Sequence, residues 1–264
     1  MISCASAGIF SGYALAADKL DCAEYLYRNV NISNKLELFW KVFAKGLLSD
    51  YLYSLTAHGD YLSIPMCFPV CYVPILSAEY YWLYGGFNRV WNKYMFAAAN
   101  YPFLQLRPSL IKGRLAIDGG AVDNIPLFPL LKSKSASFAP SELDLIVIMH
   151  FDSRYDYRNN FVTDTPILDL DLSYCNGFKK AHCDYSTETV EERLSKSYEY
   201  GNVIADKLFS GDCSRESLRG AIDEIFLREH AERQRNLSLD RFMTILNTVG
   251  RVLRKDGKCI KKLF

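Results

Sequence analysis

The chain opens with the hydrophobic pattern of a strand end, and a helical pattern follows at once. Residues 1–4 are predicted to close a strand, and the small residues 5–8 are predicted to form a tight turn. Apolar positions then recur at helical intervals from Ile9 to Lys19. The order strand, tight turn, helix is therefore expected at the start of the sequence.

Helical spacing returns twice before the first long β segment. Asp21 and Glu24 have the spacing of a capping box, which predicts a helix that runs through Tyr27. Between residues 35 and 55 the apolar positions again recur at helical intervals, with an interruption at Gly46. Both segments are therefore predicted to be helical.

A β pattern replaces the helical one between Ile64 and Tyr84. Aromatic and β-branched residues form two runs there, which divide near Ser77 and Ala78. A helix is expected over residues 88–99. Residues 114–117 are predicted as a short strand that leads into a turn.

The second half of the chain alternates strands with helices. Residues 143–149 form one continuous apolar run, which is typical of a strand buried on both faces of a parallel sheet. A long amphipathic helix is expected over residues 190–208. This alternation indicates an α/β fold.

The composition changes after Phe209, and the change suggests a domain boundary. Residues 214–235 are highly charged with a helical pattern, and Ser238 is expected to cap another helix. We therefore predict a core over residues 1–209 and a helical, basic C-terminal extension over residues 210–264.

Composition excludes several classes of function. The 264 residues carry 31 Lys and Arg against 30 Asp and Glu, so the near-neutral charge gives no indication of nucleic-acid binding. No run of about 18 apolar residues predicts a membrane-spanning helix. The eight cysteines form no C-x-x-C pair and are expected to be reduced thiols of a cytoplasmic protein. A zinc site on His58, Cys67 and Cys71 would lack a fourth ligand at a typical spacing, so no metal site is predicted there.

Candidate chemistry begins with Ser6, inside Cys4-Ala5-Ser6-Ala7-Gly8. A serine between a strand and a helix, with small neighbours, has the pattern of a nucleophile elbow, in which a sharp turn presents the hydroxyl. The N–H groups of the helix, starting at Ala7 and Gly8, would point to where an oxyanion forms. The alternative is an ordinary strand-to-helix turn that Ser6 caps.

The second candidate is Asp118, which follows a short predicted strand and precedes Gly119 and Gly120. A serine hydroxyl needs a base, and a carboxylate at the tip of a neighbouring strand can serve. Because the reference pKa of Asp is about 3.9, burial in a cleft would have to make this carboxylate more basic. Alone, however, the Asp-Gly pair indicates only a turn.

Together these motifs resemble the patatin-like phospholipase family, which pairs a G-x-S-x-G serine with an aspartate in D-G-[GA], without a histidine. The resemblance covers about residues 1–209 and includes three further short segments: Ala98-Ala99-Asn100-Tyr101-Pro102, Asn124-Ile125-Pro126 and Tyr198-Glu199-Tyr200-Gly201. It implies a three-layer α/β/α fold with a mainly parallel sheet. It also implies hydrolysis of lipid acyl esters by a Ser6–Asp118 dyad, with Ala7, Gly8, Gly119 and Gly120 in support and no cofactor.

Two departures from the family pattern affect the expected activity. Cys4 replaces the first glycine of the elbow, and no glycine-rich oxyanion loop precedes Ser6. Met1 falls inside what should be a central strand. These departures predict a start that is truncated relative to the family, and a poor or inactive hydrolase unless an extension or a partner chain supplies the loop.

Two other functions remain open at this stage. An α/β-hydrolase triad would use Ser6, Asp118 and either His150 or His182, in the chain order that such triads have. A catalytically inactive fold would bind lipid or a protein partner. Ester turnover separates an enzyme from a binding protein, and replacement of His150 separates a triad from a dyad.

Two segments suggest contact with lipid. Residues 251–264 hold six basic residues and one acidic residue, so this end is expected to touch an anionic membrane surface, with about 1 kcal/mol from each basic residue. The alternative is a solvated tail. The aromatic residues of the β segment would either line an acyl groove or serve ordinary sheet packing; they are Tyr72, Tyr80, Tyr81, Trp82 and Tyr84.

Overall fold

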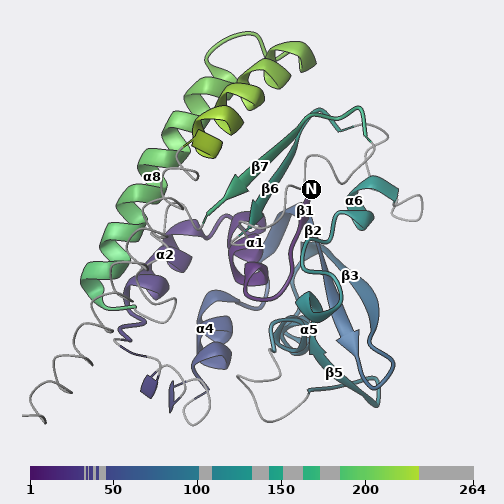
Figure 1. The fold of residues 1–264 in the computed structure, drawn as a ribbon. Coiled ribbons are helices and arrows are strands. Elements are labelled where there is room, and N and C mark those ends of the chain that lie inside the picture. Colours follow the sequence, from purple (N-terminus) through teal and green to yellow (C-terminus); the bar gives the residue numbers. More distant parts are fainter. Residues whose placement is uncertain are drawn as a thin grey trace, which may run out of the picture. The chain divides into compact units, whose positions relative to one another are not determined.

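The computed structural model describes residues 1–32, 34, 36–37, 40–41, 46–100, 109–132, 143–150, 163–172 and 185–231. These residues form an α/β structure of mixed helices and strands (Figure 1). The chain divides into two compact units: residues 1–143 with 175–198, and residues 144–174 with 199–264. The predicted α/β class is therefore confirmed.

The first unit is built on a five-stranded sheet, and β2 (Tyr61–Tyr72) is its central strand. The other strands are β1 (Ile2–Ser3), β3 (Ser77–Gly86), β4 (Ser109–Ile111) and β5 (Arg114–Asp118). β1 is parallel to β2, whereas β3 and β5 are antiparallel to it and β4 is antiparallel to β5. The sheet is thus mixed, not mainly parallel, because the β segment from residue 61 to 86 closes on itself as a hairpin.

One edge of β2 carries both β1 and β5. The other edge pairs with β3 from Met66 to Tyr72. β1 ends where Ser3 pairs with Cys67, and β5 arrives from the opposite direction and ends where Asp118 pairs with Val70. The two strands therefore meet with their carboxyl ends facing each other along a single edge.

Pro69 lies in the gap between these two strand ends. Cys67 directs its carbonyl to the β1 edge, where it accepts a bond from Cys4 N at 2.9 Å. Residues two apart in a strand direct their backbone groups to the same edge, so Pro69 also faces the gap. Proline has no N–H that could donate to a neighbouring strand, and neither β1 nor β5 pairs with this position.

Helices pack on the central strand and give the unit its core. They are α1 (Gly8–Ala16), α2 (Leu20–Arg28), α4 (Leu47–Leu55), α5 (Val90–Ala98) and α6 (Phe128–Lys132), with a short 3₁₀ turn, η1 (Gly119–Ala121). Both α1 and α5 pack against β2, which is buried from Met66 to Tyr72. The helices predicted near residues 9–19, 21–27 and 88–99 are confirmed, and α4 confirms the part of the 35–55 prediction after Gly46, whereas residues 42–45 lie outside the described residues. The two predicted β runs are confirmed as β2 and β3, which form a hairpin with its turn at residues 73–76, slightly before the predicted division near Ser77 and Ala78.

One local prediction is wrong. Lys19 is the N-cap of α2, and no side chain caps it; Asp21 lies inside the first turn. Glu24 instead bonds Arg28 one turn later, at 2.6 Å. The half-buried Glu24 carboxylate thus pairs with an i,i+4 cation, and the capping box does not form.

The second unit holds the parallel pair β6 (Ile146–His150) and β7 (Ile167–Asp171), with the end of α8 (Thr187–Phe209) and a helix over residues 215–231. One apolar cluster joins these elements: Leu168, Leu170, Ile204, Leu208, Leu218, Ile222 and Ile225. The strand pair therefore groups with residues beyond 199, whereas the sequence predicted a division near residue 210.

The prediction that residues 143–149 are buried on both faces is wrong. Ile146 and Ile148 are buried, but Val147 and Met149 are 46% and 60% exposed. Two predicted features lie outside the described residues: the helix capped by Ser238 and the basic tail 251–264. No helix in the described part of the chain combines the length and hydropathy that a membrane span requires.

Gly119 holds η1 against β2, and its replacement tests that contact. A Cβ on Gly119 would lie 2.0 Å from the carbonyl oxygen of Pro69, which the backbone cannot easily relieve. We expect Gly119→Ala to lower the free energy of unfolding in urea by about 1–3 kcal/mol. The control is Gly201→Ala on α8, where nothing lies within 4 Å of a new Cβ. That change should stabilise the helix by about 0.5–1 kcal/mol; equal effects of the two changes would contradict the packing argument.

Candidate active site

Ser6 occupies a sharp turn between β1 and α1. Its φ is +53°, in the left-handed region that side chains rarely adopt, while α1 begins two residues later at Gly8. A non-glycine residue in this region costs about 1–2 kcal/mol and persists only where the surroundings impose it. The strained serine between strand and helix has the backbone geometry of a nucleophile elbow.

The strand before the turn and the helix after it approach closely because of Gly12. A Cβ on Gly12 would lie 2.2 Å from Cys4 Sγ, so the missing side chain makes room for the thiol. Burial raises the pKa of Cys4 to about 12, so the thiol stays protonated and acts as a small apolar group. Cys4 is therefore compatible with the elbow, because the missing side chain of Gly12 in α1 leaves room for its thiol.

Asp118, at the end of β5, accepts a hydrogen bond from the Ser6 hydroxyl. Ser6 Oγ donates to Asp118 Oδ2 at 2.5 Å, and the backbone N–H of Gly120 donates to Oδ1 at 2.7 Å. The residue is only 1% exposed. Two residues 112 positions apart are thus brought together because their strands end on the same edge of β2.

Burial sets the basicity of this carboxylate. Desolvation raises the pKa of Asp118 above its ordinary value, and the bonds from Ser6 and Gly120 N oppose the rise without cancelling it. A raised pKa makes the ionised carboxylate a stronger base toward a hydroxyl. The basic aspartate that the sequence required is therefore present.

The two glycines after Asp118 have different tasks. Gly119 lies against Pro69, as described above. Gly120 lies beside the hydroxyl: an ideal Cβ there would be 3.0 Å from Asp118 Oδ1 and 3.5 Å from Ser6 Cβ. The bare Cα of Gly120 thus lets Asp118 and Ser6 lie closer than a side chain at this position would allow.

Backbone N–H groups at the start of α1 determine what the elbow can bind. The N–H groups of Gly8 and Ile9 donate to Ala5 O and Ser6 O, at 3.0 and 3.2 Å. Ala7 is exposed, and its N–H makes no backbone bond within the described residues. Ala7 N–H is therefore the available donor in the place where an oxyanion would form.

Tyr80 fixes the loop that follows the glycines, and sequence patterns did not single it out for this task. Its hydroxyl donates to Asp123 Oδ2 at 2.5 Å, while Asp123 N donates to Gly119 O at 3.0 Å. Tyr80 faces Pro69 across the hairpin. Only the strand register reveals this role, because Tyr80 and Asp123 are 43 positions apart.

The other aromatic residues of the hairpin mainly serve packing. Tyr81 packs its ring on Phe68, Trp91 and Tyr94, and its hydroxyl bonds that of Tyr72 at 2.6 Å. Tyr84 is 61% exposed. These contacts favour the sheet-packing interpretation over an acyl groove.

The triad alternative gains no support from His150. Its Nε2 lies 2.6 Å from Asp169 Oδ1, with both side chains buried in the β6–β7 pair of the second unit. The other candidate, His182, lies outside the described residues. Within the second unit, His150 is thus bonded to the carboxylate of Asp169.

The zinc alternative is not supported either. Among the described residues, no three His, Cys, Asp or Glu side chains gather as metal ligands do. Cys67 and Cys71 are buried with free thiols, and burial raises the pKa of both. These thiols are expected to pack as small apolar groups.

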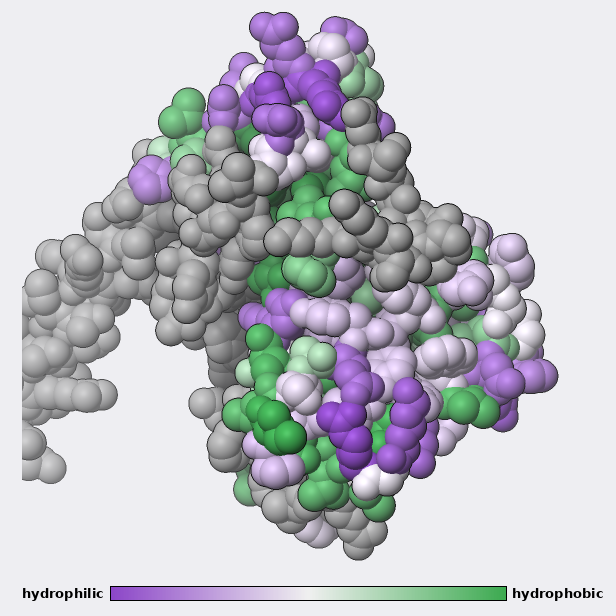
Figure 2. Space-filling view, turned by 90° about the vertical axis from the view of Figure 1, so that its right-hand side faces the viewer, coloured by the Kyte–Doolittle hydropathy of each residue, from purple (hydrophilic) through white to green (hydrophobic). Residues whose placement is uncertain are grey.

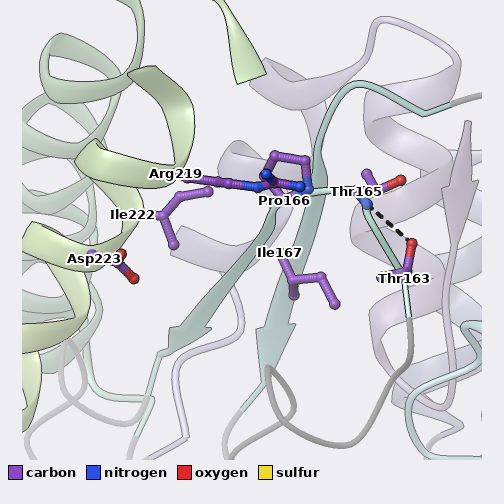
Figure 3. A pocket seen from close by; sticks show the side chains of 7 residues that line it. All are labelled: Thr163, Thr165, Pro166, Ile167, Arg219, Ile222 and Asp223. Carbon is purple, nitrogen blue, oxygen red and sulfur yellow. Dashed lines mark hydrogen bonds between the residues drawn. The ribbon is translucent and has the colours of Figure 1, made fainter. Parts of the chain in front are cut away.

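A separate pocket lies in the second unit, with a volume of about 280 Å³ (Figure 3). Its lining residues are Thr163, Thr165, Pro166, Ile167, Arg219, Ile222 and Asp223. In Figure 3 the backbone of Thr165 is bonded to the hydroxyl of Thr163, at 3.1 Å. The lining contains no paired nucleophile and base, so it offers none of the chemistry of the Ser6–Asp118 pair.

No protein-family model matches the chain, and no curated protein is significantly similar to it in sequence.

The contact between Cys4 and Gly12 predicts an interaction that a double-mutant cycle can measure. Gly12→Ala should lower the free energy of unfolding by about 1–3 kcal/mol, because the new methyl group overlaps Cys4 Sγ. In a Cys4→Ala background the same change should cost at least about 1 kcal/mol less. Additive effects would show that the thiol does not set the spacing of strand and helix.

Asp118→Asn is expected to stabilise the protein at neutral pH. Because the pKa of Asp118 is raised on folding, its ionised form weakens the folded state above that pKa, and protonation removes this cost as the pH falls. The variant should therefore unfold at a higher temperature than the wild type at pH 7, and the difference should shrink toward acid pH. A variant that is less stable at pH 7 would show that the ionised carboxylate is favoured by its surroundings.

Proposed function

We propose that this protein is a serine hydrolase of lipid acyl esters, with Ser6 as nucleophile and Asp118 as base. The observation that carries the proposal is the 2.5 Å bond from the strained Ser6 hydroxyl to a buried carboxylate of raised pKa. A serine bonded to a base, at the tip of a strand and beside a free helix N–H, is the arrangement that acyl transfer needs.

The reaction proceeds by two acyl transfers. Ser6 Oγ bonds to the carbonyl carbon, its proton passes to Asp118 Oδ2, and the carbonyl π electrons move to the oxygen. The tetrahedral intermediate collapses, the alcohol leaves, and its oxygen takes the proton from Asp118. Water then attacks the acyl-enzyme with Asp118 again as base, which releases the carboxylic acid and restores the serine.

The elbow contributes to both steps. Ala7 N–H is positioned to donate to the oxyanion, and the positive end of the α1 dipole favours the negative charge there. Gly120 N–H keeps one oxygen of Asp118 occupied, so the other oxygen stays directed at Ser6. These groups are in place before substrate binds, which lowers the cost of reorganisation during reaction.

A surface at one end of the same sheet supports a lipid as the substrate. Four aliphatic side chains are exposed on or beside two neighbouring turns: Ile75 (82%), Leu76 (56%), Leu110 (54%) and Leu115 (43%). The turns are joined by a bond from Val73 N to Leu115 O at 3.1 Å, and Lys112 and Arg114 lie between the aliphatic residues. Exposed aliphatic groups beside cations suit the boundary of an anionic lipid layer.

The position of these turns agrees with that interpretation. They continue β2 past Val70, the residue that pairs with Asp118, so the exposed aliphatic residues lie beyond the carboxyl end of β1. On the face drawn in Figure 2, hydrophobic and strongly hydrophilic residues lie side by side in the lower half. The three-layer fold and the patatin-like family are part of the same proposal, supported by the ordered motifs and by the Ser–Asp geometry.

Ester turnover and active-site labelling test the proposal together. Ser6→Ala should abolish hydrolysis of a short-chain nitrophenyl ester and covalent labelling by a fluorophosphonate, because the attacking oxygen is lost. Asp118→Asn should lower kcat by about 10²–10⁴-fold through loss of the base. The control is Ser11→Ala, on the exposed side of α1, which should change neither readout.

Two outcomes would overturn this assignment. If Ser6→Ala keeps wild-type turnover and labelling, another residue is the nucleophile and the proposed dyad is wrong. If His150→Ala abolishes turnover while the fold is retained, the triad replaces the dyad.

A further inference from the structure

The proposed reaction needs a second hydrogen-bond donor for the oxyanion, in addition to Ala7 N–H. Loss of one such donor from an acyl-transfer site costs about 10²–10³-fold in rate, so a single N–H is a weak oxyanion hole. The nearby N–H groups of Gly8, Ile9 and Gly120 are already bonded, to Ala5 O, Ser6 O and Asp118 Oδ1 respectively. Among the residues that the structure describes, the side chains that border the serine are therefore the candidates for a second donor.

Asn124 is such a side chain. An ideal Cβ on Gly120 would lie 3.2 Å from Asn124 Oδ1, 3.0 Å from Asp118 Oδ1 and 3.5 Å from Ser6 Cβ. The space above the Gly120 Cα is thus bordered at once by the nucleophile, the base and the carboxamide. A methyl group there would meet both oxygens more closely than ordinary van der Waals contact, so Gly120 allows the three side chains to converge at this point.

The backbone of Asn124 is held while its carboxamide can turn. The preceding residue, Asp123, is tied to Tyr80 OH and to Gly119 O, and Pro126 stiffens the chain two residues later. The Asn124 side chain is exposed and makes no hydrogen bond with residues that the structure describes. Since the oxygen and the NH₂ of a carboxamide exchange by a half turn, either can face the Gly120 space.

We propose that Asn124 is a catalytic residue of this hydrolase and that its side-chain N–H donates to the oxyanion, together with Ala7 N–H. The inference rests on the proposed Ser6–Asp118 reaction and adds a group to it. As negative charge develops on the carbonyl oxygen, the NH₂ turns toward that oxygen and Oδ1 turns away. Gly120 is required at its position because any side chain there would crowd Asp118 Oδ1 and Asn124 Oδ1.

Steady-state kinetics of three variants tests the role of Asn124. Asn124→Ala should lower kcat for a short-chain nitrophenyl ester by about 10²–10³-fold with little change in KM, because the bond forms only in the transition state. Asn124→Asp keeps the shape but replaces the donor by an anion, and it should lose at least as much. The matched control is Asn202→Ala, on an exposed position of α8, which should retain full kcat.

The rate of Ser6 labelling by a fluorophosphonate gives a second readout. Its phosphoryl oxygen takes the place of the oxyanion, so Asn124→Ala should label more slowly than wild type while its unfolding temperature stays the same. If kcat and labelling rate of Asn124→Ala stay within about threefold of wild type, the assignment of Asn124 is wrong and the dyad stands. If wild-type turnover and labelling do not depend on Ser6, the proposed function itself fails, and the assignment of Asn124 fails with it.

Discussion

The candidate site depends on the way in which β1 and β5 share one edge of the central strand β2. β3 pairs with β2 along one edge, so β1 and β5 must share the other, where they end at Cys67 and Val70. A register shift of two residues in β5 would move Asp118 by about 7 Å and break its bond to Ser6. Pro69 and Gly119 both stabilise this meeting point: proline needs no partner in the gap, and glycine alone fits above its carbonyl.

The same meeting point is locally unfavourable for stability. Ser6 is held at a left-handed φ, and burial raises the pKa of Asp118, which must be ionised to act as a base. Both features cost free energy in the folded state and become useful only when a hydroxyl must lose a proton. The apolar core around β2, which includes Tyr13, Phe68 and Met95, offsets that cost.

The periodicity of apolar residues predicted where helices and strands form. It did not predict how each element is capped or how far its side chains are buried. It predicted the two β runs between residues 64 and 84 and the helices α1, α5 and α8, because spacing along the chain directly reflects which face is apolar. The capping box expected at Asp21 and Glu24 does not form, since Glu24 pairs with Arg28. Val147 and Met149 are apolar but exposed. Composition alone cannot distinguish a strand covered on both faces from one covered on a single face.

The candidate chemistry could be predicted from local sequence: Ser6 in a turn of small residues, and Asp118 before two glycines. These are local features, since a turn type and a glycine requirement are set within a few residues. The folded chain was needed to reveal that the two side chains meet, that Gly12 makes room for Cys4, and that Tyr80 and Asn124 border the candidate site. Such contacts join residues up to 112 positions apart, and strand register, which no local pattern encodes, sets their distances.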